Sequence, residues 1–349
     1  MAANLPLNTP THMTPPTSTT GATPGQQEIG AYFGLELPSY GNIPQNHPGR
    51  SVMLNSGRNA LEYILRHLPG ITRLHLPAYA CPALLQPLAR LGIPHTAYAI
   101  TPRLELEQLP RLQPNEHILY INYYALKEHY IDTLAAHYGS SLIIDNSQSL
   151  YSPPRPGIPS FYSPRKNSGL PDGGIAVLDR PALPLEERDT SYPAAGYLLQ
   201  RLEQTAETAA LACEQSERRL DNLPMRRISL LTERLMHGID YETARRIRWE
   251  NFTNLHNALR RGNKLAIDPA SIAVPYCYPL WTGLPGLRDH LIDHGILIPR
   301  YWPETLGDTL PGSTERQLAD NLLPLPVDQR YTAGHMKRII RTIADYYAD

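Results

Sequence analysis

Apolar and polar residues follow one another along this chain in the alternating order of strands and helices. Two continuous apolar runs, residues 118–121 and 142–145, are typical of strands that are covered on both faces. Apolar residues spaced by three and four positions after Gly57 and over residues 84–91 predict buried helix faces. This alternation from Ile29 onward predicts an α/β fold with a mostly parallel central sheet flanked by helices.

The same pattern divides the chain into three parts. Residues 1–28 are rich in Thr, Pro, Ser and Gly and bury too little apolar surface to fold, so we predict a disordered tail. Residues 29–225 carry the strand and helix alternation and form the expected large domain. Further on the pattern turns mainly helical and then mixed, with apolar strands expected at 274–279 and 296–298. Residues 226–349 are therefore expected to form a smaller α+β domain.

Composition and charge exclude several classes of function. The 349 residues carry a net charge of −1, which gives no electrostatic footprint for nucleic acid or an anionic membrane. The three cysteines lie far apart and, like the histidines, lack metal-ligand spacing, so neither a disulfide framework nor a metal site is expected. No window approaches the roughly 20 apolar residues of a membrane span, and the first residues lack the features of a secretory signal. We therefore expect a soluble protein of the cytoplasm.

Lysine is scarce, and one of the four lysines lies in the run Ser163-Pro-Arg-Lys166, between two expected strands. An amine that condenses with an aldehyde needs the edge of a rigid sheet and fixed partners for the rest of the cofactor. Asp145 ends an apolar strand upstream, at the edge where open α/β sheets bind ligands. The hypothesis is that Lys166 forms a Schiff base with pyridoxal phosphate (PLP) while Asp145 holds the pyridine nitrogen protonated. Taken alone, Lys166 also fits a solvated surface charge, and Asp145 a turn cap.

A candidate phosphate cup lies at Ser56-Gly57-Arg58, where a turn feeds a helix. Backbone N–H groups and the positive end of a helix dipole suit a dianionic phosphate, and the hydroxyl of Ser163 adds a donor. If the cup forms, Arg58 also adds a positive charge. The simpler interpretation is that Ser56 only caps the helix and that Arg58 pairs with an acid on the surface.

The order of these segments resembles that of the DegT/DnrJ/EryC1/StrS aminotransferases, which are fold-type I PLP enzymes. The matching motifs are Ser56-Gly57-Arg58, Pro77-Ala-Tyr79, Asp145-Asn-Ser-Gln148, and Ser163-Pro-Arg-Lys166 followed by Asp172-Gly-Gly174. Residues 248–252, Arg-Trp-Glu-Asn-Phe, resemble the helix motif at the start of the family's small domain, and residues 323–331 resemble its closing segment. The resemblance covers the chain from about residue 29 to its end.

The resemblance implies a role for each matched position. Lys166 is then the Schiff-base lysine, Asp145 the partner of the pyridine nitrogen, and Gln148 a contact of the ring's 3-oxygen. Tyr79 stacks on the pyridine face, and the amides of Gly57 and Arg58 with the Ser163 hydroxyl bind the phosphate. The implied activity is the transfer of an amino group from an amino-acid donor, glutamate or glutamine, to a keto-sugar. By the same resemblance the acceptor is nucleotide-linked and destined for a surface polysaccharide, and the enzyme is a homodimer.

Two departures from the family pattern concern the substrate end of the site. Typical members carry a threonine where this chain has Arg58, and a Gly-Tyr-Asn-Tyr-Arg segment, which reaches the neighbouring subunit's site, has no counterpart between Gly174 and Arg227. Three alternatives therefore stay open. The first is a PLP-dependent lyase, although relatives that dehydrate sugars replace the lysine present here as Lys166. The second is a non-catalytic binding protein with the same fold. The third is an unrelated α/β nucleotide-binding enzyme, although neither a Gly-x-Gly-x-x-Gly turn nor a Gly-Lys-Ser/Thr loop is present.

Overall fold

The computed structural model describes residues 35–179, 185–303 and 311–348. The predicted tail, residues 1–28, lies outside the described residues. Residues 39–349 form one compact unit. The boundary near residue 225 between a large and a small domain stays a prediction.

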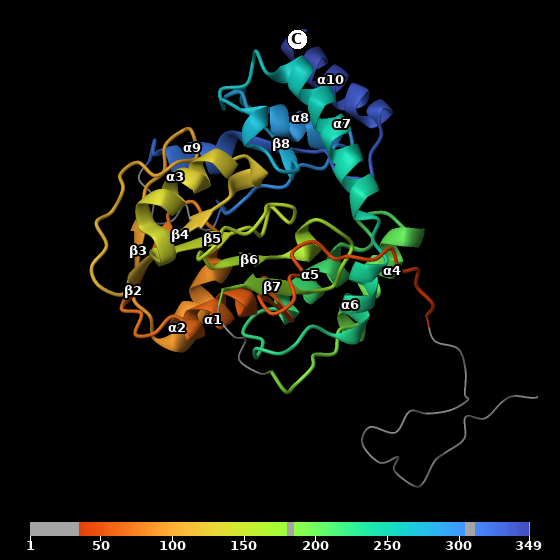
Figure 1. The fold of residues 1–349 in the computed structure, drawn as a ribbon. Coiled ribbons are helices and arrows are strands. Elements are labelled where there is room, and N and C mark those ends of the chain that lie inside the picture. The colour runs from red at the N-terminus through yellow and green to blue at the C-terminus, as the bar shows by residue number, and fades with distance from the viewer. Residues whose placement is uncertain (1–34, 180–184, 304–310, 349) are drawn as a thin grey trace, which may run out of the picture. The chain divides into compact units, whose positions relative to one another are not determined.

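A seven-stranded sheet forms the centre of this unit (Figure 1). Its strands lie in the order β1-β7-β6-β5-β4-β2-β3, and neighbours are parallel except in the pairs β1–β7 and β6–β7. The strands are β1 (Ser51–Leu54), β2 (Arg73–Pro77), β3 (His95–Tyr98), β4 (Glu116–Ile121), β5 (Leu142–Asp145), β6 (Ser160–Tyr162) and β7 (Gly174–Val177). Every residue of β5, β6 and β7 is buried, as expected for strands that are covered on both faces. The predicted α/β fold with a mostly parallel sheet is confirmed.

Helices surround the sheet and continue into the C-terminal part of the chain. They are α1 (Gly57–His67), α2 (Leu85–Leu91), α3 (Glu128–Tyr138), α4 (Gly196–Glu203), α5 (Ala210–Arg219), α6 (Leu230–His237), α7 (Tyr241–Leu259), α8 (Leu287–Asp293), α9 (Thr314–Asn321) and α10 (Ala333–Ala348). The first of them, α1, packs against β1, β6 and β7 through its predicted apolar face, including Leu61, Ile64 and Leu65. It begins where the Ser56 side chain accepts a hydrogen bond from the N–H of Asn59. The start of α1 is thereby fixed beside the sheet.

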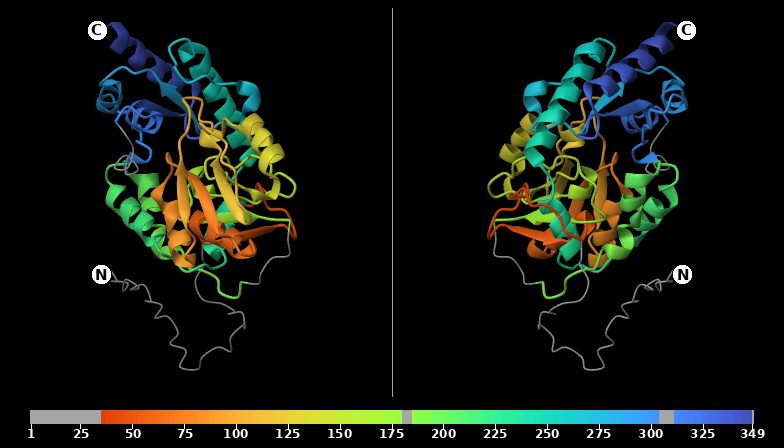
Figure 2. Two further views of the ribbon diagram at one scale, coloured as in Figure 1. Left: turned by 90° about the vertical axis from the view of Figure 1, so that its left-hand side faces the viewer. Right: turned by 90° about the vertical axis from the view of Figure 1, so that its right-hand side faces the viewer.

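The C-terminal elements pack on one another around a two-stranded antiparallel sheet of β8 (Cys277–Trp281) and β9 (Leu322–Pro326). The expected Asp240 cap of α7 is confirmed, since its side chain accepts a hydrogen bond from the N–H of Thr243. Helix α7 contacts α10 and β8, and the three views show these elements side by side (Figures 1 and 2).

One strand prediction is wrong. Residues 296–298 form no strand. Ile296 and Ile298 are buried and Leu297 is exposed, which gives the alternation of a strand. Among the described residues, however, β8 pairs with β9 instead of with this segment.

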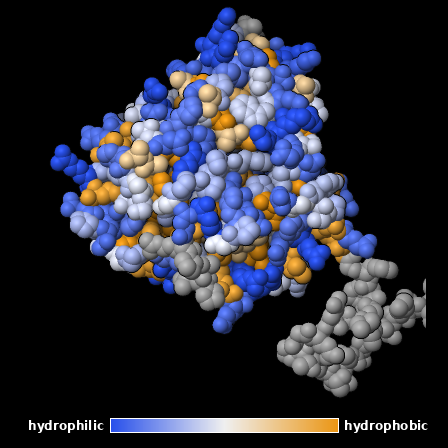
Figure 3. All heavy atoms as spheres, viewed as in Figure 1, coloured by the Kyte–Doolittle hydropathy of each residue, from blue (hydrophilic) through white to orange (hydrophobic). Residues whose placement is uncertain are grey.

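One continuous hydrophobic cluster joins the main sheet to the C-terminal elements. It includes Ile121 of β4, Leu61 of α1, Tyr278 of β8 and Leu325 of β9, all at most 3% exposed. The face in Figure 3 is largely hydrophilic, with small hydrophobic areas between charged side chains. Among the described helices, none combines the length and the apolar character that a bilayer crossing needs.

Candidate active site

The carboxyl ends of two neighbouring parallel strands bring Asp145 and Lys166 together. Asp145 is the last residue of β5 and pairs with Phe161 of β6, and Lys166 ends the short 3₁₀ turn (Pro164–Lys166) that follows β6. The Asp145 side chain is 5% exposed, and its Oδ1 accepts a hydrogen bond of 2.7 Å from the N–H of Ser147. Burial raises the pKa of Asp145, while the charge of the nearby Lys166 and the hydrogen bonds from Ser147 act against this shift. The charge of the half-buried Lys166 therefore acts on this carboxylate, and the assignment of the two residues to a Schiff base and a pyridine nitrogen stays a prediction.

Small polar groups converge at the start of α1. A β-carbon built on Gly57 would lie 3.3 Å from Ser163 Cβ, 3.4 Å from Ser163 Oγ and 4.0 Å from Ser147 Oγ. The first N–H groups of a helix have no acceptor within the helix. The Ser56 hydroxyl takes that of Asn59, whereas the N–H of Arg58 has no acceptor among the described residues. Two hydroxyls and a helix N-terminus therefore meet in a place that suits an anion.

A pair of glycines holds this helix start against β7. A β-carbon on Gly174 would lie 2.1 Å from the Ser56 carbonyl oxygen and 2.8 Å from the Gly57 nitrogen, so no other residue fits there. Ser56 also forms a parallel bridge with Gly173, whose φ of +108° is accessible to glycine at little cost. The Gly-Gly pair, which the sequence analysis treated only as a motif, thus sets the position of the candidate cup.

The segment between Gly174 and Arg227, which lacks the family's inter-subunit motif, contributes hydrogen bonds and ion pairs next to the glycine pair. Asp172, which precedes the glycine pair, is fully buried and accepts hydrogen bonds from the hydroxyls of Ser191 and Thr232. Arg219 lies 3.5 Å from the same carboxylate and 3.4 Å from Asp189. Burial raises the pKa of Asp172, whereas the hydrogen bonds from Ser191 and Thr232 and the charge of Arg219 lower it. Residues 189–232 therefore carry a polar network beneath the glycine pair.

The guanidinium of Arg58 pairs with an acidic residue and is not placed as a counter-charge for a phosphate. Its Nη2 lies 3.2 Å from Asp221 Oδ1, which follows α5. The surface pairing considered for Arg58 is thus observed, and only its backbone N–H remains at the cup.

A backbone hydrogen bond fixes the orientation of the Gln148 side-chain amide. Gln148 is 2% exposed, and its Oε1 accepts a hydrogen bond of 2.9 Å from the N–H of Tyr124. Tyr124 and Ala125 adopt φ values of 56° and 64°, a left-handed backbone that L residues rarely adopt. The Nε2 donor is therefore the end of the amide that can face a ring oxygen.

Tyr79 lies inside an aromatic cluster. Its ring is stacked on Tyr123 at 5.9 Å and meets the edge of Trp302 at 4.6 Å, and its hydroxyl lies 3.0 Å from that of Tyr124. The residue is 1% exposed, and burial raises the pKa of its phenol. Stacking on a cofactor ring would require one of these neighbours to move, so that role stays a prediction.

Ser147 is the residue that the sequence analysis missed at the cup. The signal was present, because Ser147 lies within the Asp-Asn-Ser-Gln run and two residues after Asp145. Its function was not apparent because the distance between Ser147 and Gly57 depends on the fold.

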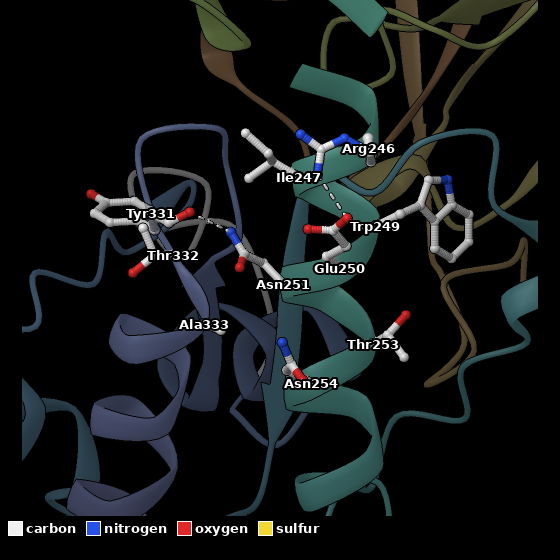
Figure 4. Close-up of a pocket in the computed structure, with 10 residues that line it drawn as sticks. All are labelled: Arg246, Ile247, Trp249, Glu250, Asn251, Thr253, Asn254, Tyr331, Thr332 and Ala333. Atoms are coloured by element: carbon white, nitrogen blue, oxygen red, sulfur yellow. Dashed lines mark hydrogen bonds and ion pairs between the residues drawn. The ribbon is translucent and has the colours of Figure 1, made fainter. Parts of the chain in front are cut away.

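Two cavities of the described surface lie away from these residues. The larger, about 700 Å³, is a groove between α7 and the segment before α10, with Asn251 reaching toward Tyr331 (Figure 4). The smaller, about 460 Å³, is lined by residues 42–45 and the start of α7. The predicted site residues line neither of them.

No family model and no curated protein sequence matches this chain. Solved structures do match. A DegT DnrJ EryC1 StrS aminotransferase from Brucella abortus is 17% identical, with a TM-score of 0.60 over 86% of each chain. The sugar aminotransferase CalS13 from Micromonospora echinospora is 16% identical, with a TM-score of 0.57 over 85% of this chain and 87% of CalS13. The PLP-form of Spr1654 from Streptococcus pneumoniae is 14% identical, with a TM-score of 0.60 over 84% of this chain and 86% of that chain. At these identities the likeness shows the fold, which is the fold that the sequence resemblance implied.

Proposed function

We propose that this chain is a PLP-dependent aminotransferase of the DegT/DnrJ/EryC1/StrS type, which transfers an amino group from an amino-acid donor to a keto-sugar. One observation carries the proposal. A buried carboxylate, Asp145, ends the central strand β5, and Lys166 lies on the turn that follows β6, the neighbouring parallel strand. The fold shared with solved sugar aminotransferases supports the same reading.

The proposed roles at the ring follow from charge. Bound PLP would supply an electron sink next to the reacting carbon. Because burial raises the pKa of Asp145, its carboxylate gains from a cation placed before it, and a protonated pyridine nitrogen is such a cation. Lys166 Nζ would bind the cofactor's carbon in the resting protein and, once released, would carry the proton taken from the donor's α-carbon. Gln148 Nε2 would donate to the ring oxygen.

The proposed phosphate site is the start of α1. Ser163 Oγ, Ser147 Oγ and the N–H of Arg58 are the donors there, and the helix dipole adds partial positive charge. The close approach of Ser163 to Gly57 supports this assignment, since the hydroxyl reaches the helix only because residue 57 has no β-carbon.

The finer assignments extend the proposal. The acceptor is proposed to be a nucleotide-linked keto-sugar used in surface polysaccharide or amino-sugar synthesis, on the strength of the family resemblance. A cytoplasmic location agrees with three cysteines that are all free thiols.

We also propose a homodimer. Helix α4 buries none of its residues, and Leu199, Leu202 and, on α5, Leu211 are 62%, 83% and 66% exposed. A helix with its apolar side in water gains little of the packing that usually stabilises helices. This apolar patch adjoins the lysine turn, because the hydroxyl of Tyr197 in α4 donates to the Leu170 carbonyl at 3.0 Å. A second copy on the patch would lie beside the proposed site.

Capture of PLP tests the function directly. The purified protein mixed with PLP should turn yellow, and borohydride reduction should fix the cofactor on the peptide that contains Lys166, as read by mass spectrometry. Lys166→Ala should lose the adduct and transamination but still bind PLP noncovalently. The matched control is Lys264→Ala, which should trap PLP as wild type does.

Two results would count against the proposal. Wild-type protein without a trapped adduct would favour a non-catalytic binding protein. Unchanged turnover in Lys166→Ala would exclude the assigned amine. With PLP bound, a panel of keto-sugar nucleotides and amino donors identifies the substrates, and elimination without amino transfer would indicate a lyase.

A further inference from the structure

A buried arginine of α7 reaches the backbone next to the candidate lysine. Arg248 is 2% exposed, and its Nη2 donates to the Asn167 carbonyl at 2.9 Å. Its Nη1 donates to the carbonyls of Pro275 and Tyr276 at 3.3 and 3.2 Å, and its Nε donates to Gln329 Oε1 at 3.0 Å. Every oxygen that it binds is neutral. Burial lowers the pKa of Arg248, and the charge of the nearby Asp328 only offsets part of this cost.

Gln329 also donates a hydrogen bond to the Asn167 carbonyl. Its Nε2 donates to Asn167 O at 3.0 Å while its Oε1 accepts from Arg248. The carbonyl of Asn167 therefore accepts two hydrogen bonds from two segments of the C-terminal part of the chain. The side-chain nitrogen of Asn167, in contrast, is buried without a partner among the described residues. The residue is held by its backbone.

The held backbone is that of the lysine turn. The N–H of Asn167 donates to the Pro164 carbonyl at 2.9 Å, and the N–H of Lys166 donates to the Ser163 carbonyl at 3.1 Å. Fixing the carbonyl of Asn167 therefore fixes the end of the turn from which the Lys166 side chain departs.

Helix α7 also holds the loop that presents Gln329. Asn251 lies three residues after Arg248, on the same side of the helix, and is 2% exposed. Its Nδ2 donates to the carbonyls of Val327 at 3.2 Å and of Tyr331 at 3.0 Å, the second of which is drawn in Figure 4. Asn251 thus holds the loop that carries Gln329, the partner of Arg248.

We propose that Arg248 and Gln329 are positioning residues, which orient the Lys166 amine through the carbonyl of Asn167. The inference rests on the proposed function, in which that amine binds PLP. Apolar side chains would pack α7 at a lower desolvation cost than a buried guanidinium does. What the guanidinium and the amide add is a fixed direction for one peptide group, and functional side chains need such support to stay in a productive geometry.

Gln329→Glu separates positioning from mere packing. The new carboxylate still accepts from Arg248 Nε and adds an ion pair, but it presents an oxygen to the Asn167 carbonyl in place of a donor. If the residue only holds Arg248, the variant should be as thermally stable as wild type and trap PLP at the same rate. If it positions the lysine, trapping should slow by roughly tenfold to a hundredfold with little change in melting temperature.

The measurement is the rate at which the apo protein, mixed with PLP and quenched with borohydride, accumulates adduct on Lys166. Gln317→Glu is the matched control, because Gln317 is bound to the Gly312 carbonyl on an exposed part of α9. Gln329→Met, which removes both hydrogen bonds without adding charge, should slow trapping as well if Gln329→Glu unfolds.

The outcomes separate the two claims. Failure of wild type to trap PLP on Lys166 refutes the proposed function and the positioning role with it. Trapping by wild type together with wild-type rates in Gln329→Glu, or in Gln329→Met where Gln329→Glu unfolds, refutes the positioning role alone.

Discussion

The contact between Gly57 and Ser163 offers the sharpest test of the candidate phosphate cup. A methyl group at residue 57 would lie 3.3 Å from Ser163 Cβ and 3.4 Å from its Oγ. Gly57→Ala should therefore push Ser163, which precedes the lysine turn, away from the start of α1. The remaining helix is left as it is, because Gly57 is its first residue.

The expected magnitudes differ between stability and binding. An extra methyl in a packed site costs about 1–3 kcal/mol, and replacing glycine by alanine in a helix returns up to about 1 kcal/mol. The free energy of unfolding should then fall by about 0–3 kcal/mol. A hydrogen bond to a charged group contributes about 1.5–3 kcal/mol, so loss of one phosphate donor should weaken PLP binding roughly 10- to 100-fold.

Two measurements decide the matter, namely urea unfolding of the apo protein and equilibrium titration with PLP. Gly196→Ala is the control, since Gly196 is also the first residue of a helix and its β-carbon would meet open space. The double variant Gly57→Ala/Ser163→Gly removes both clashing atoms. It should show a favourable coupling in the unfolding free energy of about 0.5–3 kcal/mol.

The reasoning fails if Gly57→Ala loses stability but binds PLP with wild-type affinity. In that case Ser163 and the helix start pack together without forming a phosphate site. Equal losses of PLP affinity in Gly57→Ala and Gly196→Ala would instead show that the effect is not local.

The remaining predictions concern charge and assembly. Because burial raises the pKa of Asp145, its contribution to apo stability is full below the unfolded pKa and is lost as pH rises through the folded pKa. The amide in Asp145→Asn cannot ionise, so chemical denaturation should show that this variant gains stability relative to wild type as pH rises. Its PLP-dependent turnover should fall. A difference in stability that does not change with pH would contradict the assignment. Leu202→Glu, on the exposed side of α4, should convert the proposed dimer into a monomer in light scattering, whereas Leu297→Glu, at an exposed leucine that belongs to neither α4 nor α5, should not. A wild-type monomer at all concentrations would exclude the dimer.

The main sheet and the lysine–aspartate pair could be predicted from the sequence because both depend on short-range patterns. Residues 142–144 are continuously apolar, which marks a strand covered on both faces, and Asp145 ends this strand. Lys166 follows the next strand after one turn. Neighbouring parallel strands end at the same edge of the sheet, so the closeness of the two side chains follows from the topology.

The partner of β8 could not be predicted in the same way. Residues 296–298 alternate like a strand, whereas β9 contains Pro324 and Pro326, which cannot donate to a ladder. A two-stranded sheet has an open edge on each strand, so prolines are tolerated there. Local propensity therefore favoured the wrong segment.

The contacts that support the candidate site could not be predicted from sequence patterns either. Gln329 and Asn167 are 162 residues apart, and the contact of Gly174 with Ser56 joins β7 to the start of α1. Such pairs become neighbours only after the chain has folded, and a single sequence holds no periodicity that links them. The motifs at 172–174 and 248–252 could be recognised in the sequence, but their structural roles depend on contacts that form only in the fold.

The large groove on the surface is the wrong place to look for the chemistry, and the reason is physical. The groove of about 700 Å³ is lined by α7 and the segment before α10, where Asn251 donates to the Tyr331 carbonyl, whereas Asp145, Gln148 and Tyr79 lie outside it and are at most 5% exposed. Burying an ionisable group costs stability, and groups whose pKa is shifted by burial, such as Asp145, cluster at functional sites. Trp302, which meets the Tyr79 ring, adopts a φ of 54°, and such strained backbone persists where a surrounding structure imposes it, often at functional sites. A flat ring can stack on Tyr79 only if a neighbour such as Tyr123 or Trp302 moves, so binding of PLP by Tyr79 requires a rearrangement of this aromatic cluster.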